Sequence, residues 1–354
     1  MKRVNYLYVF LLISLTVITS CGKDDDQSKS STDYSDILQN AGENVILKTY
    51  EDLATKSQLL YQACIDLQNN PTVVHLEAAR AAWVATRSPW EQAEGFLFGP
   101  VDQEGIDPSI DSWPVNVVDL NNVLASTNAL TIDFLSQQEG TLKGFHTIEF
   151  LLWGENSQKA VTSFNTREFE YLSASAGVLM NDTQKLYDLW KPTGGNFIQH
   201  LLKAGNGSLI YISQKSALEE MTNALIIIAD EVGNGKINDP FSQKDLTLEE
   251  SRFSSNSKAD FANNIRSIQN IYTGRFGQWG NGKSISEIIA KKNPAINTNF
   301  INQINGTIEL IENLPGSFSD AVFNHPSNVV ACQISVRNLQ KTLEQSVLPI
   351  ISNL

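Results

Sequence analysis

Several signatures that identify common enzyme classes are absent from this chain of 354 residues. It has no His-Glu-x-x-His zinc motif, no Cys-x-x-Cys pair and no Gly-x-Ser-x-Gly nucleophile elbow. The first absence removes the usual basis for assigning a zinc protease, and the last removes that for an α/β-hydrolase. Any catalytic assignment must therefore rest on a less common arrangement of residues.

The sequence is also short of basic residues. Lys and Arg number 26 against 39 Asp and Glu, which gives a formal net charge of -13. A nucleic-acid partner would require a basic face, so this balance argues against one. It is compatible with a cation as the ligand.

Only three cysteines are present. Cys64 and Cys332 each lie in an apolar pattern with helical spacing, where buried free thiols are common. They could form a disulfide in an oxidising compartment, but the pattern favours two separate core thiols.

The apolar stretch at the N-terminus is too short to span a membrane. Tyr6 to Ile18 is thirteen residues, whereas a spanning helix needs ~20. Lys2 and Arg3 precede the stretch and Ile-Thr-Ser-Cys follows at residues 18–21, which is the form of a bacterial signal peptide with a lipobox. We therefore expect residues 1–20 to be removed and a lipid on Cys21 to anchor the mature chain to a membrane.

Residues 21–35 contain little that could be buried and predict a flexible acidic tether. The run Asp24 to Asp26 allows two interpretations. It is a solvated spacer, or it resembles the acidic export signal by which lipoproteins of Bacteroidetes reach the outer face of the outer membrane. We expect an outer-membrane lipoprotein of the cell envelope, and the second interpretation exposes it at the cell surface.

From residue 36 onward the chain shows helical periodicity, punctuated by proline and glycine, and no sustained alternation of the kind that predicts strands. Asn165 to Glu168 has the form of a capping box and starts a helix that ends before Pro192. Apolar stripes predict two further long helices, which end at Gly233 and at Pro349. The body is therefore predicted to be all-α.

Two stretches interrupt the helices and are long enough to matter in a compact protein. Residues 98–115 hold three prolines and several acids, and we interpret them as a loop of the functional site. Residues 191–207 are rich in glycine and asparagine and are interpreted as a domain junction. The predicted architecture is two helical-bundle-like domains, residues 36–195 and 196–354, packed side by side.

The most unusual segment is Gly-Phe-His-Thr-Ile-Glu-Phe-Leu-Leu-Trp-Gly at residues 144–154. In a helix, His146 and Glu149 lie one turn apart on one face, with Cβ atoms roughly 5–6 Å apart. Their apolar neighbours imply a helix buried on nearly every side, so the polar pair must be satisfied. Either the pair is satisfied within the core, by its own hydrogen bond or by an arginine, or it binds a metal ion.

A second polar group lies upstream of this segment. Ser88, Pro89 and Glu91 fit an N-cap, a proline at the first helical position and a capping-box acid, which gives Glu91 a structural role. Glu94 precedes an apolar run and needs a cation, supplied either by Arg87 or by a metal. The loop that follows adds further candidates: Asp102, Glu104, Asp107, Asp111 and Trp113-Pro114.

The second half of the chain offers fewer candidates. Ser254, Asn256 or Ser257 is expected to cap the helix that contains Asp260 and Asn264. The remaining histidines have no ligand-like companion at helical spacing and are expected to be ordinary surface or boundary residues: His75, His200 and His325.

The Gly-x-His-x-x-Glu pattern of Gly144, His146 and Glu149 resembles the signature of the imelysin family. Further blocks resemble the patterns of that family's two domains, in the same order: Trp83, Arg87, Trp90, Glu94, Phe98-Gly99-Pro100 and Trp113-Pro114, then Ser251-Arg252-Phe253-Ser254, Asp260, Asn264 and Tyr272-Thr273-Gly274. The resemblance spans roughly residues 40–345 and is specific because several blocks of rare residues occur in order. It implies an all-α fold of two bundle-like domains, with a site at or near their interface.

The resemblance implies two classes of activity. The family has been classed as metallopeptidases, and it also includes iron-regulated envelope proteins and the metal-binding domain of a periplasmic iron-uptake component. A hydrolytic zinc site needs about three protein ligands, an open position and a base, and no distinct base is evident here. One histidine among carboxylates suits iron or another cation held by oxygen better than the usual nitrogen-rich zinc site.

The function predicted from the sequence is an envelope lipoprotein that binds a divalent metal ion or metal complex, iron or zinc, in iron acquisition. Outer-membrane iron-uptake proteins are the expected partners. The predicted ligands are His146, Glu149 and Glu94, with Arg87, Glu91, Asp102, Asp111 and Trp113 in supporting positions. The alternatives are a metallopeptidase that uses Glu149 and His146 with a loop acid as base, and a non-catalytic adhesin or scaffold.

Overall fold

The computed structural model describes residues 32–354. The predicted signal peptide, Cys21 and most of the predicted tether lie outside the described residues. The described residues form helices and no strand, which confirms the predicted all-α fold. None of these helices combines the length and the apolar character that crossing a membrane requires.

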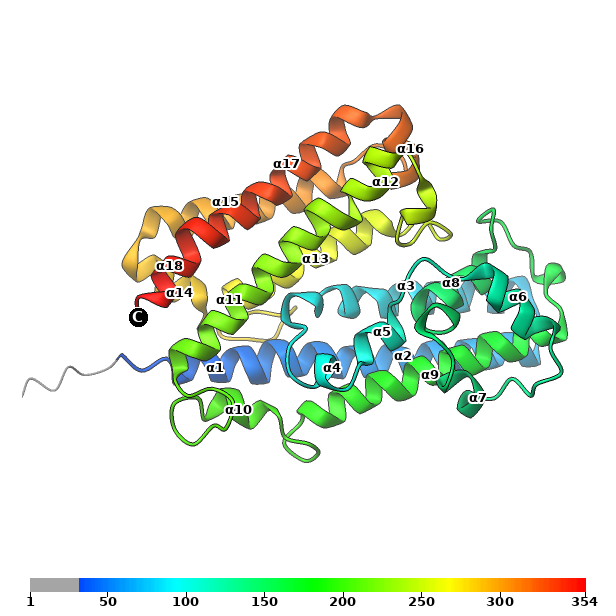
Figure 1. Cartoon of the computed structure of the whole chain (residues 1–354), viewed down its shortest axis with the longest axis horizontal. Helices are drawn as coiled ribbons and strands as arrows, with labels where there is room; N and C mark the ends of the chain where they lie inside the picture. The colour runs from blue at the N-terminus through cyan, green and yellow to red at the C-terminus, as the bar shows by residue number, and fades with distance from the viewer. Residues whose placement is uncertain (1–31) are drawn as a thin grey trace, which may run out of the picture. The chain divides into compact units, whose positions relative to one another are not determined.

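Four helices that pack against one another build the first half of the body (Figure 1): α2 (Leu47–Asn69), α3 (Val73–Glu91), α8 (Gly144–Trp153) and α9 (Thr166–Trp190). α1 (Ser35–Asn40) and a π-helical turn (Ala41–Ile46) precede α2 in one continuous helical run. The predicted capping box starts α9, where Asn165 and Glu168 each accept a backbone N–H. α9 ends before Pro192, as predicted.

Short helices fill the connections of this half. The predicted site loop, residues 98–115, contains two of them, and the predicted junction, residues 191–207, contains one. In chain order the short elements are η2 (Glu94–Phe96), α4 (Pro100–Gln103), α5 (Ile106–Ile110), α6 (Val117–Ala125), α7 (Ile132–Ser136), η3 (Gly140–Leu142), η4 (Val161–Ser163) and α10 (Ile198–Leu202).

The second half is built around α11, α13, α15 and α17, which pack against one another. Its elements are α11 (Gln214–Asp230), the π-helical turn η5 (Glu231–Lys236), α12 (Asn238–Gln243), η6 (Leu246–Leu248), α13 (Ser257–Thr273), α14 (Ile285–Lys292), α15 (Pro294–Glu312), α16 (Phe318–Asn324), α17 (Pro326–Thr342), the π-helical turn η7 (Leu343–Val347) and α18 (Leu348–Ser352). Two predicted helix ends are wrong. The helix expected to end at Gly233 opens into η5, and Pro349 lies in the first turn of α18, where a missing N–H does no harm.

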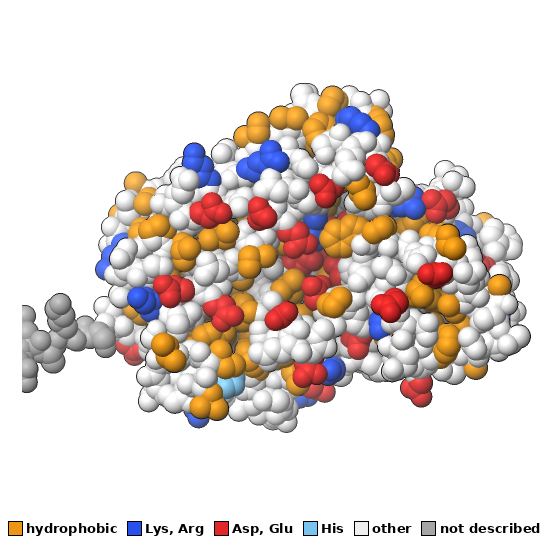
Figure 2. Space-filling view, viewed as in Figure 1, with side chains coloured by type: hydrophobic (Ala, Val, Ile, Leu, Met, Phe, Trp, Pro, Cys, Tyr) orange, Lys and Arg blue, Asp and Glu red, His pale blue; other side chains and the backbone are white. Residues whose placement is uncertain are grey.

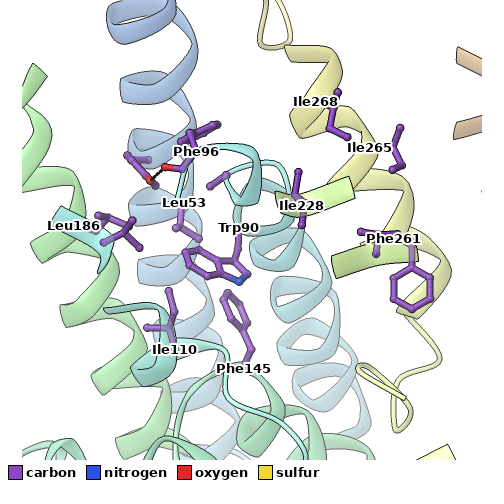
Figure 3. Close-up of a cluster of buried hydrophobic side chains, with 14 of the residues drawn as sticks. Leu53, Trp90, Phe96, Ile110, Phe145, Leu186, Ile228, Phe261, Ile265 and Ile268 are labelled. Carbon is purple, nitrogen blue, oxygen red and sulfur yellow. Dashed lines mark hydrogen bonds between the residues drawn. The ribbon is translucent and has the colours of Figure 1, made fainter. Parts of the chain in front are cut away.

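The two halves meet where α13 packs against α3 and where η2 packs against α11 and α13. Figure 3 shows apolar side chains from both halves in this region, among them Leu53, Trp90 and Phe145 from the first and Ile228 and Phe261 from the second. Residues Tyr34–Leu354 form one compact unit. The domain boundary at residues 195–196 stays a prediction.

The two cysteines of the described body are both buried and both free. Cys64 lies on α2 and Cys332 on α17. Burial raises the pKa of the Cys332 thiol to about 11 and raises that of Cys64 further. The prediction of two separate core thiols is confirmed.

Candidate metal centre

Buried charged side chains gather where the two halves of the body meet. We call this group the acidic cluster, and each of its side chains is at most 6% exposed. Figure 2 shows acidic side chains in a hollow near the middle of the molecule's face. The cluster comprises six carboxylates, Glu91, Glu94, Asp111, Glu149, Glu250 and Asp260, together with Arg87, Lys236 and His146.

Arg87 is the cation at the centre of the cluster. It lies one turn before Glu91 on α3, and its guanidinium pairs with Glu91 and with Asp111. Its Nη2 lies 3.0 Å from Glu250 Oε1 and its Nε lies 3.5 Å from Asp260 Oδ1. Burial lowers the pKa of Arg87, but the surrounding carboxylates, led by Asp111, raise it well above its usual range. Arg87 is therefore a permanent cation.

The predicted capping role of Glu91 is wrong. α3 continues through Ser88 and Pro89 to Glu91, so these residues end a helix instead of starting one. The Glu91 side chain is fully buried and pairs with Arg87 at the i, i+4 spacing of one helix face. This buried pair keeps the helix continuous, although the local Ser-Pro-x-Glu string is compatible with a helix start.

Lys236 is the second cation, at the end of η5. Its Nζ lies 2.8 Å from Glu94 Oε2, 2.9 Å from Glu250 Oε1 and 3.6 Å from Glu91 Oε2. Burial lowers the pKa of Lys236, but these carboxylates raise it well above its usual range. The cation that Glu94 needs is therefore Lys236, and not Arg87 as one alternative had it. No local signal marks this lysine, which lies 142 residues from Glu94.

α8 places His146 and Glu149 one turn apart, as predicted, with Nδ1 3.3 Å from Glu149 Oε2. The other ring nitrogen, Nε2, lies 3.1 Å from Asp111 Oδ1 without hydrogen-bond alignment. Glu149 Oε1 accepts two hydrogen bonds from Ser254, from its backbone N–H and its hydroxyl, both at 2.7 Å. Burial lowers the pKa of His146, but Asp111 and Glu149 raise it to about 9.

The glycine of the Gly-x-His-x-x-Glu pattern has a steric role. Gly144 has a φ of +74°, and a Cβ atom there would collide with the carbonyl oxygen of Ile110. The start of α8 is thus pressed against the end of α5. This close approach brings Asp111, the residue after α5, next to His146.

Two overlapping sets of side chains could hold a metal ion. The first consists of Asp111, His146 and Glu250, and the second of Asp111, Glu250, Glu91 and Glu94, with all ligand atoms in a set within 4.8 Å of one another. Within the cluster, Glu250 Oε2 is a buried oxygen with no hydrogen-bond partner. Carboxylate oxygens with one imidazole are a donor set that fits iron or a similar cation.

The supporting candidates differ in position. Trp113 is partly exposed, its ring centroid lies 6.0 Å from that of His146, and Lys236 Nζ lies 5.5 Å from its centroid, so it covers both side chains. Asp111 receives a 2.6 Å hydrogen bond from Trp90 Nε1 and lies inside the cluster. Asp102 is exposed on α4, and within residues 32–354 no hydrogen bond or ion pair joins it to the cluster.

Side chains from the second half donate hydrogen bonds to carboxylates of the acidic cluster, a role that the predicted capping did not include. Asn264 Nδ2 donates to Glu91 Oε2 at 2.6 Å and also donates to Glu94. Asn256 occupies the N-cap position of α13, but its side chain makes no capping bond and donates to Asp260 Oδ1 at 2.8 Å instead. The histidines expected to be surface or boundary residues, His75, His200 and His325, are partly exposed and lie in neither metal-binding set.

A Gly-x-x-x-x-Gly-Lys-Ser string at residues 277–284 matches the sequence pattern of phosphate-binding loops. That pattern carries its function only between a strand and a helix. Here the string follows helix α13, and Lys283 Nζ lies 3.3 Å from Glu287 Oε1. Within the described residues it is a connection between two helices and not a phosphate cradle.

Comparisons with known proteins agree with this architecture. Residues 46–345 match the imelysin family, also designated peptidase family M75. An iron-regulated protein A of Synechococcus elongatus is 27% identical over 340 residues, which cover 95% of this chain and 90% of the relative.

Solved structures show the same fold. A crystal structure assigned to an iron-regulated protein A precursor of Parabacteroides distasonis has a TM-score of 0.81 at 26% identity and covers 90% of this chain and 94% of its own. An imelysin-like protein of Psychrobacter arcticum has a TM-score of 0.73 at 15% identity, with 90% and 95% coverage, and is similar in fold. This chain belongs to the imelysin family.

Proposed function

We propose that this protein is an outer-membrane lipoprotein that binds a metal cation, iron or zinc, through the acidic cluster and acts in iron acquisition. The observation that carries the proposal is the imbalance of charge inside the cluster. Six buried carboxylates face two permanent cations and one histidine. Even with His146 protonated, full ionisation would leave three negative charges without a partner.

The protein can relieve this imbalance in two ways. Burial raises the pKa of Glu91 and of Glu94, and it raises that of Asp260 to about 6, so the cluster can take up protons. Alternatively, it can bind a cation, which keeps the carboxylates ionised and replaces the proton on His146. Glu250 belongs to both candidate metal sets, and its Oε2 has no hydrogen-bond partner. This supports the binding of a cation.

The ligand chemistry and the relatives favour iron over zinc. The candidate sets are rich in carboxylate oxygen and contain a single imidazole. The similar proteins of Synechococcus elongatus and Parabacteroides distasonis are named as iron-regulated. A bound ion would act as a charge centre held by Asp111, His146 and Glu250, while Glu149 and Ser254 orient the imidazole.

The lipoprotein part of the proposal rests on the N-terminal sequence. Residues 1–20 have the form of a signal peptide, Cys21 follows a lipobox, and the acidic run Asp24 to Asp26 comes directly after it. Mass spectrometry of the envelope fraction tests this part. A peptide that begins at Cys21 and carries a diacylglyceryl group on its thiol is expected, and an unmodified or uncleaved N-terminus would contradict it.

Metal content and metal titration test the main part. Purified mature protein should contain stoichiometric metal, and the chelator-treated protein should bind Fe²⁺ and Zn²⁺ in calorimetric titrations. His146→Ala and Glu250→Gln should each weaken binding by roughly tenfold or more, because each removes a ligand atom. His325→Ala is the matched control, since His325 is partly exposed and lies outside the cluster. Wild-type protein that neither retains nor takes up metal would rule the proposal out.

A metallopeptidase is the second candidate, because the site loop contains an acid suited to act as a base. Burial is the main cause and the negative charge of Asp111 the next, and together they raise the pKa of Asp107 to about 7. Chelator-sensitive cleavage of unfolded protein substrates that Asp107→Asn abolishes would favour the enzyme. Metal binding without such cleavage would favour the binding protein.

A further inference from the structure

The segment between α10 and α11 displays aliphatic side chains to solvent. Leu209 is 91% exposed and Ile212 is 87% exposed, the highest values for large apolar side chains among the described residues. Ile210, between them, is 43% exposed. We call Leu209, Ile210 and Ile212 the apolar tip. Such side chains cost solubility in water, so their display calls for a partner.

The apolar tip is held in place by its neighbours. Tyr211 is buried and anchors the middle of the segment. The hydroxyl of Ser208 accepts hydrogen bonds from the backbone N–H groups of Ile210 at 3.3 Å and Tyr211 at 3.0 Å. The N–H of Gly205 donates to the carbonyl oxygen of Tyr211 at 3.0 Å. The exposed side chains are therefore presented by a fixed backbone.

The apolar tip lies beside the start of the body. The backbone N–H of Tyr34 donates to Gln214 Oε1 at 2.7 Å, and Gln214 comes two residues after Ile212. α1 also packs against α10 and α11. In Figure 1 the loop next to α10 lies at the end of the body where α1 begins, and Figure 2 shows hydrophobic side chains at the surface of that end.

The geometry points to a lipid surface as the partner of the apolar tip. We propose that Leu209, Ile210 and Ile212 insert into the membrane to which Cys21 is attached. The inference rests on the lipoprotein part of the proposed function. Cys21 precedes Tyr34 by thirteen residues, and a chain of that length reaches at most ~45 Å. The membrane is thus within reach of the tip.

The charge of the segment fits a lipid surface. Residues 203–213 contain no Asp or Glu, although the whole chain has a net charge of -13. Lys203 is exposed at the beginning of the segment, where it can approach anionic headgroups. Leu and Ile at the tip and a lysine behind them form the pattern by which a loop docks at a bilayer interface.

A fluorescent probe at the tip tests the proposal in the lipidated protein. Leu209→Cys can be labelled with an environment-sensitive fluorophore, because Cys64 and Cys332 are buried and Cys21 carries the lipid. The control is Val74→Cys, since Val74 is 75% exposed and lies in the first turn of α3, close to the end of α2. The continuous helical run from Ser35 to Asn69 separates Val74 from Tyr34 by ~50 Å.

The proteins are reconstituted in vesicles of phosphatidylethanolamine and phosphatidylglycerol. We expect a blue-shifted emission for the probe at residue 209, quenching of it by spin-labelled lipid, and neither effect at residue 74. If the protein is anchored to the vesicles but the emission and quenching of both probes show that they remain in water, the proposal is overturned. So does a shift at residue 209 that appears without vesicles and grows with protein concentration, because the tip would then contact a second copy.

A flotation assay separates this proposal from the lipoprotein assignment. If Cys21 is not lipidated, that assignment fails, and the unlipidated chain is floated with the same vesicles. Binding that falls roughly tenfold in the Leu209→Ser/Ile212→Ser double variant, and not in Val74→Ser, supports membrane insertion of the tip. No binding, or binding that the double variant retains, overturns it.

Discussion

Arg87 and Lys236 are buried cations of one acidic cluster, yet they are held in different ways. Arg87 belongs to α3, its guanidinium carbon lies 4.9 Å from the ring centroid of Phe145, and it pairs with four carboxylates. Lys236 ends a π-helical turn that contains Gly233 and Gly235, and it lies beneath the partly exposed Trp113. Arg87 is held by a regular helix, and Lys236 by an irregular turn near the surface.

This difference indicates distinct roles for the two cations. The carboxylates nearest Lys236 are Glu94, Glu250 and Glu91, and all three belong to one candidate metal set. A metal ion in that set would take the place of the Lys236 ammonium, whereas Arg87 would keep Asp260, which lies in neither metal set, as a partner. π-Helical turns frequently mark functional sites. We therefore interpret Arg87 as a structural counter-ion and Lys236 as an exchangeable one.

Replacing Arg87 should have the largest effect. Arg87→Met leaves buried carboxylates without their cation and should lower the free energy of unfolding by about 3–5 kcal/mol. Added metal should restore the stability only in part, because Asp260 lies in neither metal set and keeps no cation. Urea denaturation with and without Fe²⁺ measures both effects. Full recovery with metal would show that Arg87 is exchangeable too and would remove the distinction.

Replacing Lys236 should have a smaller effect that metal reverses. Lys236→Met should lower the free energy of unfolding by about 2–3 kcal/mol, because Asn264 still donates to Glu91 and Glu94. Saturating Fe²⁺ should restore most of this loss, since the ion supplies the missing positive charge. Thermal unfolding at several metal concentrations tests this. A loss that metal does not change would assign Lys236 the same structural role as Arg87.

The parts of the molecule that local patterns determine could be predicted from the sequence. The capping box from Asn165 to Glu168 and the i, i+3 pair of His146 and Glu149 each depend on neighbours within one helical turn. The helix end at Ser88 and Pro89 was mispredicted because the deciding contact is a buried ion pair, which a short string does not reveal.

The composition of the acidic cluster could be predicted only in part. Asp111 and Arg87 were candidates because they lie near Glu94 in the chain, and Asp260 and Asn264 were noted through the family resemblance. Lys236 was missed because its partners Glu94 and Glu91 come from the other half of the chain. Such a contact depends on the packing of α11 and α13 against η2, which periodicity does not specify.

Removing the ring above Lys236 should have a modest effect on stability. Trp113→Ala loses the contact of the ring with the ammonium and should cost about 1 kcal/mol. It should also speed metal release, because the ring covers both Lys236 and His146. Trp279→Ala is the matched control, since Lys48 Nζ lies 4.8 Å from the Trp279 ring outside the cluster. Stopped-flow transfer of metal to a chelator measures the rate, and equal rates in both variants would contradict the covering role.

Stiffening the turn that carries Lys236 should have the smallest effect, and in the stabilising direction. Gly235 has an ordinary φ, and a methyl group added there would meet no atom within 4 Å. Gly235→Ala should therefore raise the free energy of unfolding by roughly 0.5 kcal/mol, because alanine restricts the unfolded chain. Gly233→Ala is the matched comparison, because its Cβ would lie 3.2 Å from Val336 Cγ1 and should give no such gain. If Lys236 must move aside for metal, Gly235→Ala should also slow metal uptake in stopped-flow mixing. Unchanged uptake in a measurably more stable variant would mean that the turn stays closed while metal binds, and Lys236 would then be as fixed as Arg87.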